Sequence, residues 1–251
     1  MLFRGYPVTP EVLDAFARPF TREYFYGYGR APFGALPAIT TVNESQLALE
    51  PHCDNGIRPE SMRPQITWFW CEQPAEADGE TTFFDGVEVW SRLSDQTRAV
   101  FRARQVSFLS RVAEPAWRAL GHRDVDSFLR FLTSLGAHAR AVDAGQTVDV
   151  EIRSAAVRTP QWIARDAVVS SMLIAGSRGF EGMRVTFDDG SSIPPGVHDD
   201  VRAALAACLT MISWRPGDVC MLDNTRFLHG RRAFTDPARR LYLIQTLHAS
   251  F

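Results

Sequence analysis

The chain has 251 residues, of which 45% are hydrophobic and 22% are charged, and its net charge is −2. This balance is typical of a single globular domain, here residues 1–251, that buries a core of normal size. It gives no support for nucleic acid or an anionic membrane as a partner. No apolar stretch reaches the roughly 18 residues of a membrane span, and no apolar leader opens the chain, so we expect a cytoplasmic protein.

The residue types that are missing exclude further classes of protein. All 27 basic residues are arginine, which excludes Schiff-base catalysis and the lysine of a phosphate-binding P-loop. The four cysteines form no C-x-x-C pair, so we expect reduced thiols rather than a structural zinc site.

The first third of the chain predicts one helix followed by strands. Thr9-Pro10-Glu11 is typical of a capped helix start. Residues 33–49 are strand-like and broken by Gly and Pro. Residues 64–71 (PQITWFWC) and 80–85 (ETTFFD) predict two further strands of β-branched and aromatic residues.

The middle of the chain predicts helices before strand composition returns. Ser94 caps a predicted helix to about residue 104, and a second helix runs from Asp124 to Leu135. We interpret residues 86–165 as a helical insertion between strands that forms a lid. Strands are predicted again at residues 148–157 and 168–174.

The last third predicts one amphipathic helix between short strands. His198 opens that helix, and its apolar face is predicted to contain Val201, Leu205, Cys208, Leu209 and Ile212. Strands are expected at residues 185–187, 219–222 and 240–247. Many short strands with a few helices predict a mainly β fold with flanking helices, a sandwich or barrel.

His52-Cys53-Asp54 is the first candidate for chemistry. Residues two apart on a strand face the same side, so the imidazole and the carboxylate would point to one place. Nitrogen and oxygen donors together suit a divalent metal. The triplet also occurs by chance and does not identify a metal site by itself.

His229 is a candidate for a third ligand, in the segment DNTRFLHGR at residues 223–231. A lone histidine is more often a structural residue, but this one follows a strand near the end of a β-rich chain. A strand that pairs beside the H-x-D segment would bring it to the same metal. Two histidines and one carboxylate leave three coordination positions open, which suits oxygen-activating iron(II).

An arginine and a threonine are candidates for binding a carboxylate. Arg240 enters the last predicted strand, where an arginine pair is usually a solvated strand end. Its planar guanidinium is also suited to holding a carboxylate, and the hydroxyl of Thr81 can add a hydrogen bond. Ordinary strand packing is the simpler interpretation of Thr81 alone.

The order of these motifs resembles the taurine dioxygenase and clavaminate synthase-like superfamily. The motifs are H-x-D, GET at 79–81, WRPGD at 214–218, DNTRFLHGR at 223–231, and an arginine at the eleventh position after His229. The resemblance covers residues 1–85 and 170–248. It implies a double-stranded β-helix, a cupin-like jelly-roll barrel, and an oxygenase that uses iron(II), 2-oxoglutarate and O2.

The resemblance also implies a role for each motif residue. The iron ligands would be His52, Asp54 and His229. Thr81 and Arg240 would bind the distal carboxylate of 2-oxoglutarate. Arg239 is the competing arginine; Arg240 is preferred because its spacing matches and Tyr242 and Ile244 share its face.

Two departures from the family patterns narrow the reaction. Members that clamp a sulfonate or aryloxyacetate have a second arginine four residues after the first, where this chain has Ile244, so such a substrate is not expected. Related halogenases have a small residue in place of the carboxylate. Because Asp54 is present, we expect oxygenation, by hydroxylation, desaturation or ring closure, rather than halogenation.

The substrate is less well defined than the cofactors. We expect a small amino-acid-like or specialised-metabolite substrate, free or tethered to a carrier protein. The polar candidates for substrate contact are Asn43, Asn55, Arg178 and Arg231, each with a simpler surface or turn interpretation. Two alternatives stay open: a cupin-type metalloenzyme with three His and one Glu that does not use 2-oxoglutarate, and a non-catalytic β-barrel that binds a small molecule.

Overall fold

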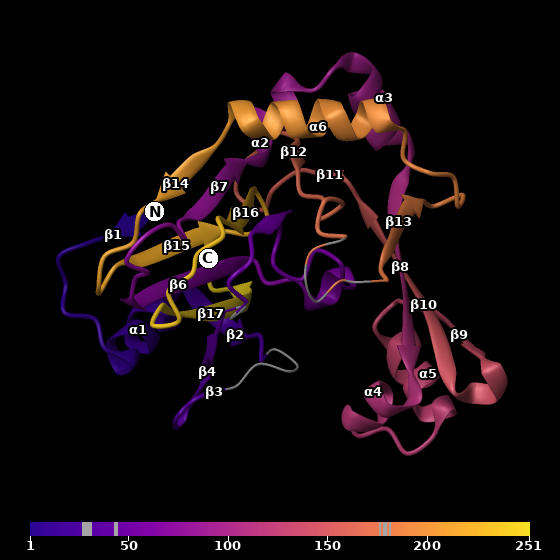
Figure 1. Cartoon of the computed structure of the whole chain (residues 1–251), viewed down its shortest axis with the longest axis horizontal. Helices are drawn as coiled ribbons and strands as arrows, with labels where there is room; N and C mark the ends of the chain where they lie inside the picture. The colour runs from indigo at the N-terminus through magenta and orange to yellow at the C-terminus, as the bar shows by residue number, and fades with distance from the viewer. Residues whose placement is uncertain (27–31, 43–44, 176, 178–179, 181) are drawn as a thin grey trace.

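The computed structural model describes the chain except for residues 27–31, 43–44, 176, 178–179 and 181. Its main body is built from two antiparallel sheets, drawn on the left of Figure 1. The larger sheet has the order β1 (Leu2–Phe3), β15 (Val219–Asp223), β6 (Ile66–Gln73), β17 (Arg240–Ala249), β4 (Leu36–Thr41) and β3 (Pro32–Phe33), and β2 (Thr21–Tyr24) also pairs with β17. The smaller sheet has the order β14 (Thr210–Ile212), β7 (Thr81–Asp85), β16 (Phe227–Arg231) and β5 (Leu49–His52).

The central strands of the larger sheet are buried on both faces. On β6, Phe69 packs between the two sheets and Trp68 packs on the opposite face. On β17, Leu243 packs between the two sheets with Phe69, and Ile244 packs on the opposite face with Trp68. Burial on both sides is why the predicted strand at residues 64–71 is an unbroken apolar run rather than an alternating one.

A short helix covers the outer face of the larger sheet. Helix α1 (Pro10–Ala17) begins as predicted, with the Thr9 hydroxyl accepting a hydrogen bond from the amide of Val12 at 3.3 Å. Leu13 and Ala17 are fully buried against the sheet. The single turn η1 (Arg18–Phe20) then leads into β2.

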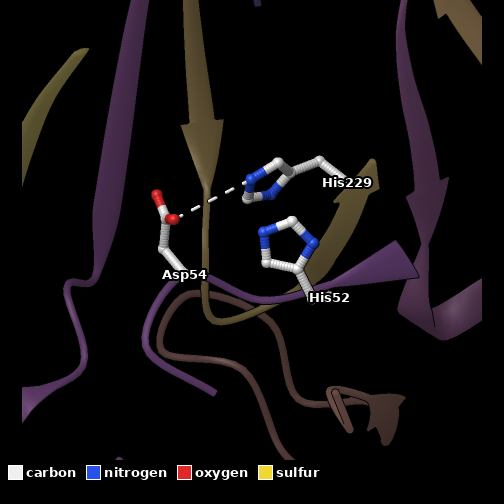
Figure 2. Close-up of side chains that lie close together, drawn as sticks. All are labelled: His52, Asp54 and His229. Carbon is white, nitrogen blue, oxygen red and sulfur yellow. Dashed lines mark ion pairs between the residues drawn. The ribbon is translucent and has the colours of Figure 1, made fainter. Parts of the chain in front are cut away.

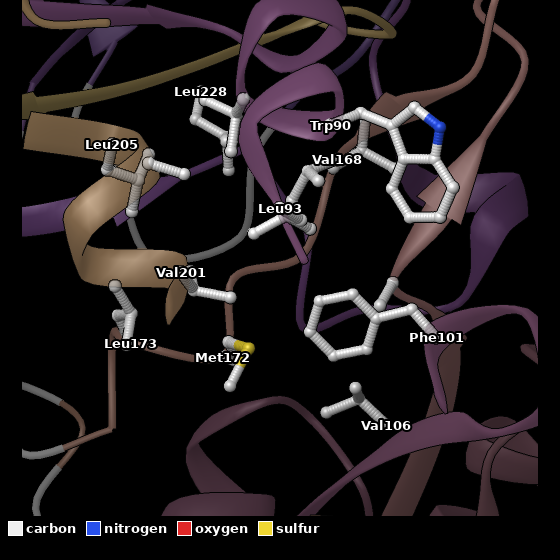
Figure 3. Close-up of a cluster of buried hydrophobic side chains, with 14 of the residues drawn as sticks. Trp90, Leu93, Phe101, Val106, Val168, Met172, Leu173, Val201, Leu205 and Leu228 are labelled. Carbon is white, nitrogen blue, oxygen red and sulfur yellow. The ribbon is translucent and has the colours of Figure 1, made fainter. Parts of the chain in front are cut away.

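A helical layer lies beside the smaller sheet and crosses the top of Figure 1. Its elements are α2 (Gly86–Arg92), α3 (Asp95–Ala103), α6 (Pro195–Ala207) and the strand pair β11 (Val157–Arg158) and β12 (Ala167–Val168). Figure 3 shows the cluster of buried apolar side chains that joins them, in which Phe101 and Val201 lie together with Leu228 of β16. The residue next to His229 is therefore anchored in this core.

An arm extends from this layer towards the lower right of Figure 1. Its sheet has the order β13 (Arg184–Phe187), β8 (Gln105–Ala113), β10 (Thr147–Ala155) and β9 (His138–Val142). Helices α4 (Glu114–Ala119) and α5 (Val125–Ser134) pack on it around Trp117 and Phe128, and η3 (Asp143–Gly145) joins β9 to β10. The segment 86–165, interpreted as a helical insertion, thus holds four α-helices and also three strands of a separate sheet, of which only β10 lies where a strand was expected.

The last predicted helix begins and ends at other residues in the structure. Helix α6 begins at Pro195, because proline suits the first helical position, and it ends at Ala207. Leu209 and Ile212 are therefore not on its apolar face: residues 210–212 form β14, which pairs with β7 at the edge of the smaller sheet. Among the described residues, no helix is long and apolar enough to cross a membrane.

Candidate metal centre

Two neighbouring strands of the smaller sheet bring His52 and His229 together. Strands β5 and β16 are antiparallel and pair these two residues directly, with ring centroids 4.4 Å apart. The register then shifts, so that two residues of β5, Glu50 and Pro51, lie opposite Gly230. Proline is tolerated here because β5 is the edge strand and its missing N–H interrupts no central ladder.

Asp54 reaches the same place from a turn rather than from a strand. Strand β5 ends at His52, so the expected alternation along a strand does not apply to Asp54. The side chain of Asn224 instead holds its backbone: Asn224 Oδ1 accepts from the Asp54 amide at 2.8 Å, and Nδ2 donates to the Asp54 carbonyl at 3.1 Å. Thr67 of β6 donates its hydroxyl to Asp54 Oδ2 at 2.8 Å, which leaves Oδ1 directed at His229.

The three side chains point toward one another in a buried cluster (Figure 2). Their possible ligand atoms lie within 4.8 Å of one another, and His229 Nε2 is 3.9 Å from Asp54 Oδ1. Donors bound to one ion at about 2.1 Å lie roughly 3 to 4 Å apart, so small side-chain rotations bring all three to a common metal. The Glu50 carbonyl lies 2.9 Å from His52 Nδ1, which places the proton on Nδ1 and leaves Nε2 for the metal.

Within the part of the chain that the structure describes, this is the only group of three His, Cys, Asp or Glu side chains close enough to hold an ion. The remaining histidines lie on other elements. His122 contacts Phe128 and Phe131 in the arm, and His198 is on α6. A three-His, one-Glu cupin site therefore finds no support among the described residues.

A small cavity of about 50 Å³ lies on one side of the metal cluster. Thr81, Arg231 and Arg239 line it together with the cluster itself and several apolar side chains. The indole N–H of Trp214 donates to Thr81 Oγ1 at 2.8 Å, so the threonine hydroxyl hydrogen is available to another acceptor. Asp54 is the only acidic side chain among the described lining residues.

Arg239, and not Arg240, reaches this cavity. Leu241 and Leu243 line it, so residues of β17 with odd numbers face the cavity and those with even numbers face α1. Arg239 lies just before the strand on the same side, with Nη2 donating to the Gly79 carbonyl at 3.2 Å. Arg240 is exposed and donates to the Pro237 carbonyl at 2.8 Å. The structure thus brings Thr81 to the metal cluster and leaves Arg240 outside.

The two arginines of the cavity make it strongly attractive to an anion. Burial lowers the pKa of Arg239 to about 10, and burial together with the charge of Arg239 lowers the pKa of Arg231 to about 10. Both guanidinium groups lie over the ring of Phe234, each 5.0 Å from its centroid. Arg231 also donates to the carbonyls of Ser45 and Leu47, the latter at 2.8 Å. Two desolvated positive charges side by side favour a bound carboxylate.

A second cavity of about 160 Å³ lies on the other side of the cluster and shares Leu49, His52 and Asp54 with the first. Its lining contains Asn55 and Arg58 together with four apolar side chains: Phe25, Ile57, Ile174 and Phe180. Of the four residues expected to contact substrate, only Asn55 lines this cavity, while Arg231 lines the first. Asn43 and Arg178 lie outside the described residues.

Four residues at the site were missed by the sequence interpretation. Thr67 and Asn224 orient Asp54, Trp214 orients Thr81, and Arg58 lines the second cavity. Asn224 and Trp214 belong to the DNTRFLHGR and WRPGD motifs, so the motifs marked them without giving them a role. Nothing in the sequence distinguishes Thr67 from any other threonine on a strand.

Comparison with known proteins adds three findings. The family model for taurine catabolism dioxygenase TauD, TfdA family matches residues 1–247. A clavaminate synthase-like protein of Arabidopsis thaliana is 29% identical over 283 residues, which cover 96% of this chain and 79% of that protein. The dapdiamide synthesis protein DdaC of Enterobacter agglomerans is 24% identical over 228 residues, which cover 79% of this chain and 66% of that protein. The structure of AAD-2 in complex with Mn(II) and N-oxalylglycine matches with a TM-score of 0.60 at 17% identity, covering 100% of this chain and 82% of that one. The last finding confirms the expected double-stranded β-helix fold.

Proposed function

The chain belongs to the taurine catabolism dioxygenase TauD, TfdA family, and from this premise we propose that it oxidises a small, anionic, amino-acid-like substrate by hydroxylation, desaturation or ring closure. Enzymes of this family are iron(II)- and 2-oxoglutarate-dependent dioxygenases, so iron(II), 2-oxoglutarate and O2 take part in its reaction. One observation carries the proposal: two separate cavities meet at the His52, Asp54 and His229 cluster.

We assign the iron ligands to His52, Asp54 and His229. Bound there, iron(II) activates O2 for C–H oxidation as 2-oxoglutarate is converted to succinate and CO2. The protein itself orients the ligand atoms. The backbone carbonyl of Glu50 holds the proton of His52 on Nδ1, and the hydroxyl of Thr67 donates a hydrogen bond to Oδ2 of Asp54. This leaves one nitrogen of each histidine and one carboxylate oxygen for the metal.

We assign the distal carboxylate of 2-oxoglutarate to Arg239 and Thr81. Both line the smaller cavity, where Trp214 orients the Thr81 hydroxyl and the Gly79 carbonyl holds the Arg239 guanidinium. A cavity of about 50 Å³ suits the distal end of this co-substrate and is too small for a second organic substrate. This assignment replaces Arg240, whose side chain is exposed.

We assign the substrate to the larger cavity. A volume of about 160 Å³ is that of an amino-acid-sized molecule. Among the described residues, the lining combines apolar side chains with one cation, Arg58, and the amide of Asn55. An arginine beside apolar side chains suits a carboxylate attached to a short apolar body. Packing such a body against His52 and Asp54 places its C–H bonds next to the metal and excludes water from the reaction.

The cofactor chemistry is tested by anaerobic titration of the apoprotein with iron(II) and then with 2-oxoglutarate. We expect the weak visible charge-transfer band of the iron chelate in the native protein and in His138→Ala, an exposed histidine of the arm, and its loss in His229→Ala. Iron binding without the band in the native protein would contradict the use of 2-oxoglutarate.

The substrate class is tested by measuring succinate formation with free N-acylated and unmodified amino acids and with the same groups loaded on a carrier protein. If the substrate is anionic, Arg58→Gln should raise the KM for that substrate by about 10- to 100-fold without changing the affinity for 2-oxoglutarate. Arg130→Gln, an exposed arginine on α5, serves as the control and should change neither value. A KM that is the same in Arg58→Gln and in the native enzyme would refute the anionic-substrate proposal.

A further inference from the structure

We propose that the protein has a further anion-binding site, separate from the sites proposed for 2-oxoglutarate and for substrate, in a cavity lined by Arg63 and Arg158. Its ligand would be a small oxyanion such as a carboxylate or phosphate. The cavity has a volume of about 280 Å³. It lies between the start of β6, strand β11, the turn after β15 and the end of β17. It shares only Cys53 with the described lining of the proposed substrate cavity and no residue with that of the 2-oxoglutarate cavity.

Arg63 brings a charge into this cavity that the protein does not fully satisfy. Its Nε donates to the Arg58 carbonyl at 2.8 Å, but no described residue accepts a hydrogen bond from its Nη2, which is enclosed. Because Nη2 itself has no exposed surface, an oxyanion in the cavity would meet the rest of the Arg63 side chain, which lines it, and would be attracted by its positive charge. Burial, with a further contribution from the charge of Arg158, lowers the pKa of Arg63 to about 10, so the group is charged at neutral pH.

Arg158 supplies the second positive charge from β11. Its Nη1 is paired with Glu60, whose side chain is 76% exposed and lies at the rim. Counting arginines and carboxylates, the described lining has one more positive than negative charge. Glu60 therefore competes with an incoming anion for Arg158, but because its carboxylate is screened by solvent it does not cancel the positive charge of the cavity.

The remaining polar lining fits the same kind of ligand. Thr159, Gln161 and Thr225 also line the cavity, as does Asn224, whose amide nitrogen already donates to the carbonyls of Asp54 and Pro64. Guanidinium groups bind planar or tetrahedral oxyanions through paired N–H donors, whereas a cation would be repelled. The occupant is therefore a small oxyanion that rests against the back of the Asp54 turn.

The test uses the iron-loaded protein under anaerobic conditions with saturating 2-oxoglutarate, so that the site lined by Arg239 and Thr81 is filled. Inorganic phosphate and acetate are titrated separately by isothermal calorimetry, which distinguishes a phosphate from a carboxylate ligand. We expect Arg158→Gln to weaken binding of the preferred anion by about tenfold or more. Glu60→Gln removes the competing carboxylate and should tighten binding several-fold.

Two features keep the result decisive. Glu60 is exposed and Arg158 is only partly buried, and neither belongs to an apolar core cluster, so we expect both variants to fold. Arg130→Gln in the arm controls for a general loss of positive charge. The proposal is overturned if neither anion binds at millimolar concentration, or if Arg158→Gln, Glu60→Gln and Arg130→Gln bind it equally. Because 2-oxoglutarate is already bound, failure here leaves the proposed oxygenase function untouched.

Discussion

Arg239 and Arg240 are neighbours in the chain, but we expect substitution of Arg239 to weaken 2-oxoglutarate binding strongly and substitution of Arg240 to leave it almost unchanged. Arg239→Gln removes a partly buried charge that lines the cavity next to Thr81, while Arg240→Gln removes an exposed one. The two variants make the same chemical change at adjacent positions. They therefore separate the direct contact from any general effect of charge on this end of β17.

The magnitude follows from the surroundings of each group. A hydrogen bond to a charged group contributes about 1.5–3 kcal/mol, which corresponds to roughly a 10- to 150-fold increase in Kd for 2-oxoglutarate in Arg239→Gln. Among the described residues, Arg240 donates only to the Pro237 and Arg239 carbonyls, at 2.8 and 3.2 Å, and its charge is screened by solvent. We expect its loss to change the Kd by less than about twofold.

The assay is the anaerobic titration of the iron-loaded variants with 2-oxoglutarate, followed by the charge-transfer band. Circular dichroism and the affinity for iron(II) confirm that each variant is folded and has an intact metal site. A large increase in Kd in Arg240→Gln with none in Arg239→Gln would refute the assignment and would mean that the end of β17 is shifted by one residue from its position in the structure.

Three further predictions follow from the residues around the metal. Thr67→Val removes the hydroxyl that binds Asp54 Oδ2 and should raise the Kd for iron(II) by about 10- to 100-fold in a metal titration, whereas Thr186→Val, a buried threonine of the arm, should leave it unchanged. Gly230→Ala would place a Cβ 2.5 Å from the Leu49 carbonyl oxygen and should lower the free energy of unfolding by about 1–3 kcal/mol in denaturant titrations. Gly196→Ala has open space around it and should not lower this free energy. Equal stabilities of the two variants would show that β5 and β16 can move apart without cost. Burial depresses the pKa values of both Arg239 and Arg231 to about 10, so both lose their protons above that pH. The affinity for 2-oxoglutarate, measured between pH 8.5 and 10.5, should fall above pH 10, and the fall should be smaller in Arg239→Gln, where only Arg231 still titrates.

The local sequence was sufficient to predict most elements and the type of site. Capping residues predicted the start of α1 and both ends of α3 and α5 closely, because these signals act within one or two turns of a helix. The β-branched and aromatic residues of β6 likewise predicted a strand. The H-x-D triplet and the later histidine predicted which side chains the fold brings together, because ligand chemistry depends on residue type.

What the sequence could not decide was which way individual side chains face. Arg239 and Arg240 differ only by one step along the chain, and the packing of Leu241 and Leu243 between the two sheets selects Arg239 for the cavity. Asp54 was expected on a strand, but the strand ends at His52 and Asn224, 170 residues away in the chain, fixes its turn.

The same limit applies to β14 and to the cavities. Residues 210–212 continue an apolar helical pattern in the sequence, yet pairing with the edge of β7 makes them a strand. Arg58, Arg63 and Arg158 resemble surface arginines until the fold places them around enclosed space. Residue type and local spacing thus determined the chemistry available to this protein, while contacts between residues distant in the chain decided where each charge lies.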